Sequence, residues 1–235
     1  MPKFTNNLQN DSSVNKFKQT QIQNSSKNPQ NNKNISELKI EHWNAKSIYK
    51  KRSDFKHFIL DQIKPDIISL NEIKLSNFRA SRILHFENYV TLHKARDENK
   101  NGAGGVALLI SKNINFVEIE DPGLDNLECL AIRVVLENEI FTLISYYNPP
   151  QDRLRKEIIL EITAQYSNFI ICGDLNTKSK IFGCKTTILN GSILEDIILE
   201  SHLIVVNNRN PTYHRTHDNN LDILDWALVS NSLYD

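Results

Sequence analysis

Two polar side chains, Asp174 and Asn176, directly follow a short apolar run at 169–172. Four apolar residues in a row predict a strand that is buried on both faces, and Gly173 ends the run. Open α/β folds build their sites at the carboxyl ends of such strands, so the pair is a candidate for chemistry. The segment Gly-Asp-Leu-Asn is equally typical of an ordinary turn, so the rest of the chain must decide between the two interpretations.

Other predicted strands also carry polar residues where they end. Asn44 and Glu72 close two strands in the first third of the chain, and Tyr147 closes a later one. The last predicted strand holds Asp222 and Asp225. One such residue is uninformative, but several from distant parts of the sequence indicate that they converge on one point.

Carboxylates and amides in this arrangement suit phosphoryl chemistry with a divalent metal. Magnesium prefers oxygen ligands, so Glu72 could hold the metal, which would polarise a phosphoryl oxygen. Asp174, with Asn176 holding its orientation, could position or deprotonate an attacking water. The alternatives are structural: Asn44 as a turn cap, Glu72 as a surface residue and Tyr147 as a core aromatic with its hydroxyl satisfied.

The elements that would position these residues follow from hydrophobic periodicity. Apolar runs and alternation predict strands at 38–44, 66–72, 88–94, 106–110, 115–120, 128–136, 140–147, 169–172, 203–206 and 221–230, whereas residues 211–213 read as a loop. Stripes of period 3.6 predict helices at 53–63 and 153–166, and a Ser192-x-x-Glu195 capping box predicts a third at 191–202. Glycines at 102, 104 and 105 favour a strand-entry turn or close backbone packing over a phosphate cradle. Strand–helix alternation at both ends with hairpins in the middle predicts an α/β (α+β) layered sandwich.

Composition divides the 235 residues into a tail and one domain. Residues 1–36 are rich in Asn, Gln, Lys and Ser with scattered hydrophobes, which predicts a disordered tail. Its basic charge leaves a slightly acidic remainder, which is unlike a protein that coats DNA non-specifically. The three cysteines lack metal spacing and indicate reduced thiols in an intracellular protein, and no apolar run is long enough for a membrane span.

Six motifs in order resemble the endonuclease/exonuclease/phosphatase superfamily. They are Trp-Asn-Ala at 43–45, Pro-Asp-Ile-Ile-Ser-Leu-Asn-Glu at 65–72, Gly-Gly-Val-Ala at 104–107, Tyr-Asn-Pro-Pro at 147–150, Gly-Asp-Leu-Asn at 173–176 and Leu-Asp at 224–225. Within the superfamily, the similarity is to the apurinic-endonuclease-like domain of jockey-type non-LTR retrotransposons. The resemblance covers residues 37–235 and implies a DNase I-like, four-layer sandwich of two mixed β-sheets flanked by helices.

The resemblance also implies roles for the matching positions. Glu72 is expected to bind Mg (Mn possible), with Asn44 supporting the metal–phosphate site. Tyr147 is expected to contact the scissile phosphate. At the opening pair, Asp174 is expected to handle the nucleophilic water, which Asn176 orients.

At the last motif, Asp225 is expected to hold the catalytic histidine of the family. The sequence supports no role for Asp222, which should point away from Asp225 if both lie in one strand. None of the seven histidines shows paired metal spacing, and none is assigned a role.

Two departures from the family pattern bear on activity. Such families continue to a Ser-Asp-His strand beyond the position of Asp225, so we expect a domain that is incomplete at the C-terminus and impaired in catalysis. Lys46 stands where cellular repair members carry an acidic residue.

The expected function is Mg-dependent hydrolysis of DNA phosphodiesters, nicking target DNA in the nucleus for target-primed reverse transcription. The expected partners are DNA and a downstream reverse-transcriptase domain, with no membrane. The alternatives are a phosphatase or lipid phosphodiesterase of the same superfamily, and a catalytically dead remnant that binds nucleic acid.

Overall fold

The computed structural model describes residues 38–95, 104–120, 124, 127–137, 139–215 and 220–234. The predicted tail at 1–36 lies outside these residues. Contacts divide the chain into a unit of residues 1–33 and a unit of residues 34–235, and the second unit contains every element below. No helix within the described segments is long and apolar enough to cross a membrane.

The first sheet has the strand order β1-β2-β4-β3. These strands are β1 (Ile40–Asn44), β2 (Ile67–Asn71), β3 (Tyr89–Lys94) and β4 (Val106–Ser111). β1 and β2 run parallel, so Asn44 and Asn71 lie side by side at their carboxyl ends, whereas β4 runs antiparallel to β2 and to β3. This mixed sheet confirms the strands predicted near the start of the domain.

The second sheet has the order β5-β6-β7-β8-β12-β9. Its strands are β5 (Asn115–Ile119), β6 (Glu128–Val135), β7 (Ile140–Tyr147), β8 (Phe169–Asp174), β9 (Ile204–Val205) and β12 (Asp225–Val229). β7 and β8 run parallel, and β12 runs antiparallel to β8. The register opposes Asp225 to Asp174. A separate hairpin pairs β10 (Tyr213–Arg215) with β11 (Asn220–Asp222).

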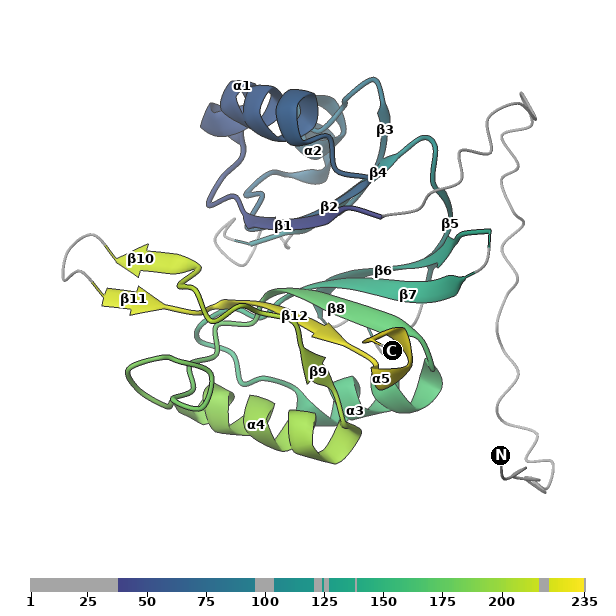
Figure 1. Cartoon of the computed structure of the whole chain (residues 1–235). Coiled ribbons are helices and arrows are strands. Elements are labelled where there is room, and N and C mark those ends of the chain that lie inside the picture. The colour runs from purple at the N-terminus through teal and green to yellow at the C-terminus, as the bar shows by residue number, and fades with distance from the viewer. Residues whose placement is uncertain are drawn as a thin grey trace. The chain divides into compact units, whose positions relative to one another are not determined.

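Helices cover the outer face of each sheet (Figure 1). Above the first sheet lie η1 (Tyr49–Lys51), α1 (Arg52–Asp54), η2 (Phe55–Ile63) and α2 (Asn77–Ile83). Below the second lie α3 (Lys156–Gln165) and α4 (Leu189–Ser201), and α5 (Asn231–Tyr234) follows β12. The helical stretch before β2 stops at Lys64, whose φ is +53°, because Pro65 follows it.

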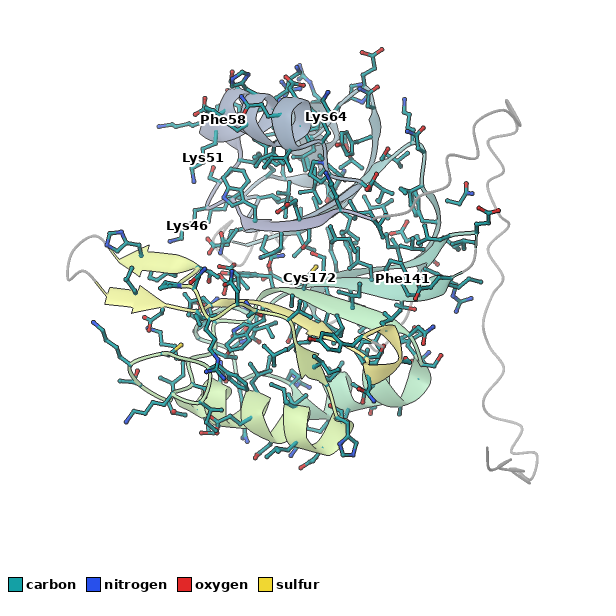
Figure 2. All side chains as sticks on the ribbon, viewed as in Figure 1. Lys46, Lys51, Phe58, Lys64, Phe141 and Cys172 are labelled. Atoms are coloured by element: carbon teal, nitrogen blue, oxygen red, sulfur yellow. The ribbon has the colours of Figure 1, made fainter. Side chains whose placement is uncertain are left out.

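Three apolar cores separate the four layers. Alternation along β2 shows the division: Ile68 and Leu70 pack against the helices, whereas Ile67 faces the second sheet. The core between the sheets includes Phe141 and Cys172, which Figure 2 shows between them. The predicted sandwich of two mixed sheets flanked by helices is therefore confirmed.

Three local predictions were wrong. The stretch 221–230 is not one strand, because β11 ends at Asp222 and β12 begins at Asp225. The loop predicted at 211–213 contributes Tyr213 to β10. Ser192 and Glu195 do not cap a helix, since α4 begins three residues before Ser192 and Glu195 instead accepts a hydrogen bond from the Ser179 hydroxyl.

Gly173 permits a close approach between β8 and β7 just before Asp174. A Cβ at this position would lie 1.7 Å from the carbonyl oxygen of Tyr146, far inside van der Waals contact. Both groups are backbone atoms of central strands, so neither can move aside without disturbing the sheet. Only glycine at this position therefore allows β8, which carries Asp174, to pair this closely with β7.

We expect Gly173→Ala to destabilise the fold by about 3 kcal/mol or more, because it forces two backbones apart. Gly183→Ala is the matched control, since its Cβ would meet only a side chain at 3.7 Å and its φ of +102° alone should cost about 1–2 kcal/mol. Urea unfolding of both variants measures the difference. Equal losses would show that the approach to Tyr146 is not the constraint.

Candidate functional site

One amide group joins carboxylates from both sheets. Nδ2 of Asn44, the last residue of β1, donates to Oε1 of Glu72 at 2.9 Å and to Oδ2 of Asp174 at 2.6 Å. Glu72 follows β2 in the first sheet, and Asp174 ends β8 in the second. Three of the residues singled out by the sequence therefore meet in one cluster.

The remaining contacts of Asp174 fix its position. Its backbone N–H donates to Oδ1 of Asn71, at 2.8 Å, and its Oδ1 accepts the backbone N–H of Asn176 at 2.9 Å. The side chain of Asn176 donates to the carbonyl oxygen of Asn148 at 2.9 Å. Asn176 thus orients Asp174 through its main chain, while its own side chain is held by the turn after β7. The turn interpretation of Gly-Asp-Leu-Asn describes this backbone, but it does not account for the contacts across the sheets.

The loops that follow the strand ends hold non-glycine residues in left-handed conformations. Lys46 and Ser47 after β1, Glu72 and Lys74 after β2, and Asn176 after β8 have φ angles of 42°, 78°, 49°, 53° and 47°. Such conformations are uncommon outside glycine and gather at functional sites, where the surrounding contacts enforce them. Their concentration here supports the assignment of a site.

Burial and neighbouring charges shift the pKa values of Asp174 and Glu72 in opposite directions. Asp174 is only 4% exposed, and this burial together with the neighbouring charge of Asp225 raises its pKa to about 7. Burial of Glu72 would also raise its pKa, but hydrogen bonds from Lys74 and Asn44 outweigh it and hold the value below the ordinary range. Glu72 is therefore ionised at neutral pH, whereas Asp174 exchanges a proton near pH 7, which suits a general base.

A histidine to which the sequence gave no role lies in the same site. Nε2 of His42 is 3.1 Å from Oδ1 of Asp225, and its Nδ1 is 3.0 Å from Oγ of Ser69. His42 precedes Asn44 by two residues, so both side chains leave the same face of β1. That spacing was the available signal, but its partner lies 183 residues away.

A pocket of about 340 Å³ opens beside Asn44 and Asp174, whereas Glu72 and Asn176 are not among its lining residues. Its lining residues come from β1 and its loop, β8, the hairpin strand β10 and the start of β12, and they are His42, Trp43, Asn44, Lys46, Asp174, Thr212, Tyr213, His214, Leu224 and Asp225. Nζ of Lys46 lies 4.1 Å from the ring centroid of Tyr213, so a cation–π contact joins the loop after β1 to the hairpin. Figure 2 shows Lys46 between these two segments.

Tyr147 and Asp222 lie apart from the pocket-lining residues. Tyr147 is 4% exposed and packs in the core between the sheets, so its predicted contact with a phosphate stays a prediction beside the structural alternative. Asp222 is buried and accepts from Nζ of Lys178 at 2.5 Å. This ion pair fixes the loop after Asn176 against β11 and gives Asp222 a structural part.

The glycine cluster supports the loop that carries Glu72. Gly104 and Gly105 have φ angles of 101° and 82°, and their carbonyl oxygens accept the N–H groups of Lys74 and Ile73. The strand-entry and close-packing interpretation of this cluster agrees with these contacts.

The oxygen donors of the cluster fit magnesium by their chemistry. Among the described residues, no group of three or more His, Cys, Asp or Glu side chains is arranged to hold a metal ion. Magnesium needs fewer protein ligands, since one or two carboxylates usually hold it together with water and substrate phosphate. Glu72, ionised and 14% exposed at its side chain, meets that requirement beside the amide of Asn44.

Comparisons with known proteins agree with this geometry. A family model described as "Endonuclease-reverse transcriptase" matches residues 141–235. The RNA-directed DNA polymerase from mobile element jockey of Drosophila melanogaster is 22% identical over 178 residues, which are 75% of this chain and 19% of that protein. The chain thus spans about a fifth of the length of the curated relative that it matches.

Solved nucleases share the fold. The endonuclease domain of TRAS1, a telomere-specific non-LTR retrotransposon, superimposes with a TM-score of 0.67 at 17% identity, covering 85% of this chain and 88% of that one. The AP endonuclease LMAP from Leishmania major gives 0.67 at 14% identity, with coverage of 83% and 80%. The 3' phosphatase NExo from Neisseria, bound to product DNA hairpin, gives 0.60 at 14%, with coverage of 83% and 88%.

The paired mixed sheets and the polar cluster where their strands end define a DNase I-like protein. The family model over residues 141–235 and the shared fold make the chain similar to the endonuclease/exonuclease/phosphatase superfamily. Within that superfamily it is similar to the endonuclease domains of non-LTR retrotransposons, which confirms the resemblance drawn from its motifs.

We expect Asp174→Asn to stabilise the fold in a pH-dependent way. The folded pKa of Asp174 is raised, so its ionisation opposes folding as pH rises from about 4 to 7, and the amide removes that penalty. Three pKa units correspond to about 4 kcal/mol, and one lost acceptor reduces the gain to about 1–3 kcal/mol at pH 8, with none near pH 4. Urea unfolding at both pH values in chelator measures it.

Asp61→Asn is the matched control, because its side chain is 51% exposed and should change stability by less than about 0.5 kcal/mol at either pH. An equal effect of Asp174→Asn at pH 4 and pH 8 would contradict the raised pKa.

Proposed function

We propose that this domain hydrolyses phosphodiester bonds in DNA with magnesium, as the nicking endonuclease of a non-LTR retroelement. The observation that carries the proposal is the junction of Asn44, Glu72 and Asp174, where one amide holds an ionised carboxylate beside one that titrates near neutral pH. The similarity to retrotransposon endonucleases supports DNA as the substrate.

Each residue of the junction has a distinct part in the proposed reaction. Asp174 accepts the proton of an attacking water, and the backbone N–H of Asn176 keeps one of its oxygens fixed. Glu72, with Asn44 beside it, would hold a magnesium ion (manganese is an alternative). When bound, that ion stabilises negative charge on the phosphate and on the leaving oxygen. Asp174 is only 4% exposed, so few water molecules can reach this base.

The wider setting follows from the jockey relative. Its name describes an RNA-directed DNA polymerase, and this chain matches a fifth of its length. We therefore propose that the domain acts with a reverse-transcriptase domain in the same element and nicks chromosomal DNA in the nucleus, leaving a 3′ hydroxyl as primer.

A phosphatase function is the second candidate, because one structural neighbour is named as a 3' phosphatase. The pocket chemistry suits either ester, since both reactions need an activated water and a phosphate-bound metal. The two differ in whether a continuous strand or a terminal phosphate reaches Asp174.

Plasmid nicking separates these functions. We expect conversion of supercoiled to open-circular DNA with Mg²⁺, loss of conversion in chelator, and a decrease of about 10²- to 10⁴-fold in Asp174→Ala, which removes the base. Glu72→Ala should weaken metal binding, shifting half-maximal activity to higher Mg²⁺. Asp61→Ala is the control, because this exposed residue lies on η2.

Release of phosphate from a 3′-phosphorylated oligonucleotide is measured in parallel. If the protein releases this phosphate but does not nick the plasmid, its function is that of a phosphatase and not of an endonuclease. Retention of DNA in a gel shift, without either reaction, would leave only a nucleic-acid-binding function.

A further inference from the structure

A chain of four polar side chains crosses the apolar core between the sheets and ends in the pocket. Oγ of Ser145 in β7 lies 2.7 Å from Oγ of Ser69 in β2, which lies 3.0 Å from Nδ1 of His42 in β1. Nε2 of His42 then lies 3.1 Å from Oδ1 of Asp225 in β12. The path therefore runs from the second sheet to the first and back to the second.

Donor and acceptor chemistry gives this chain one direction. A carboxylate only accepts, so His42 donates to Asp225 through Nε2–H. When the imidazole is neutral, its Nδ1 is an acceptor for the hydroxyl proton of Ser69, and Ser69 in turn accepts from Ser145. The arrangement assigns the Nε2–H tautomer to His42.

Burial differs sharply between the two ends. Ser69 and Ser145 are fully buried, whereas the side chains of His42 and Asp225 are 12% and 19% exposed and both line the pocket. The interior end is closed to solvent, so the hydroxyls hold the imidazole ring in one orientation. The polar chain is anchored in the core and presents a carboxylate to the site.

The carboxylate of Asp225 depends on this support. Its backbone N–H and C=O are engaged by Thr212 and Asn207, which fix the main chain but not the rotation of the carboxyl group. Within the described part of the chain, Oδ1 has the hydrogen bond from His42 and Oδ2 has none. Asp225 also lies opposite Asp174 in the strand register.

We propose that His42 is a positioning residue, which holds the carboxylate of Asp225 beside Asp174 through an Nε2–H hydrogen bond and is itself oriented by Ser69 and Ser145. This proposal deepens the proposed function and rests on it for its catalytic consequence. The competing explanation is that His42 only links the two sheets, and the two explanations differ in which ring nitrogen matters.

Two substitutions separate the ring nitrogens. Gln places its amide near the position of Nε2, so His42→Gln keeps the donor to Asp225 and loses the contact with Ser69. Asn places its amide near Nδ1, so His42→Asn keeps the contact with Ser69 and loses Asp225. Both variants keep a neutral polar group in the strand, so each is a control for the other.

We expect His42→Gln to retain kcat for DNA nicking within about three-fold of the wild type. His42→Asn should lose about ten-fold or more in kcat with KM within about two-fold, because a misoriented carboxylate affects the reacting geometry rather than binding. Urea unfolding of both variants is measured alongside. If His42→Asn retains kcat while His42→Gln loses it, or both lose activity only in proportion to lost stability, His42 is a link between sheets and the proposal is wrong.

The hydrogen bond is also tested without DNA, metal or turnover. In ¹⁵N-histidine-labelled protein, we expect the Nε2–H tautomer at His42, with a resonance that shifts in Asp225→Ala and stays in place in Asp61→Ala. An Nδ1–H tautomer, or no shift in Asp225→Ala, overturns the proposal. If the wild type nicks no DNA but gives the expected spectra, the proposed function fails while the assignment of His42 to Asp225 stands.

Discussion

The structure depends on a hydrogen-bonded junction between two sheets that are also joined by the Ser69–Ser145 and His42–Asp225 contacts and by apolar packing. Nδ2 of Asn44 donates to carboxylates that belong to different sheets, and Asn71 binds the backbone of Asp174 across the same gap. Apolar contacts are non-directional and would tolerate small shifts of one sheet over the other. The polar junction fixes the register of the two sheets at the end where the chemistry is proposed.

That junction imposes a condition on the layers around it. Buried carboxyl groups are costly unless they are hydrogen-bonded, so the strands must bring donors to them. The parallel pairs β1–β2 and β7–β8 place strand ends together, and the loops beyond them adopt left-handed conformations at Glu72 and Asn176 to aim side chains inward. The glycine at 173 allows β8 to lie close enough to β7 for Asp174 to reach the gap.

Much of this arrangement could be predicted from local patterns, and the remainder depends on distant partners. Apolar runs predicted the strands that carry Asn44, Glu72 and Asp174, because burial on both faces leaves a clear signal. His42 could not be assigned, since its significance comes from a residue 183 positions away. Ser192 and Glu195 matched a capping pattern that also occurs inside helices. In the structure the Glu195 side chain binds Ser179 instead of capping the helix. The break between β11 and β12 was not predicted, because the residues on both sides of it have the polar–apolar alternation of a single strand.

The position of β12 has a consequence for the order in which the site comes into being. β12 lies between β8 and β9, and its first residue, Asp225, contacts His42 in β1, so the pocket requires the chain from His42 to Asp225. A ribosome that adds about 5–20 residues per second needs roughly 10 to 40 s to synthesise the intervening segment. During that interval the first sheet can fold around its own core while His42 still lacks Asp225. A nascent chain of this kind lacks the pocket, which can form only after β12 has left the ribosome.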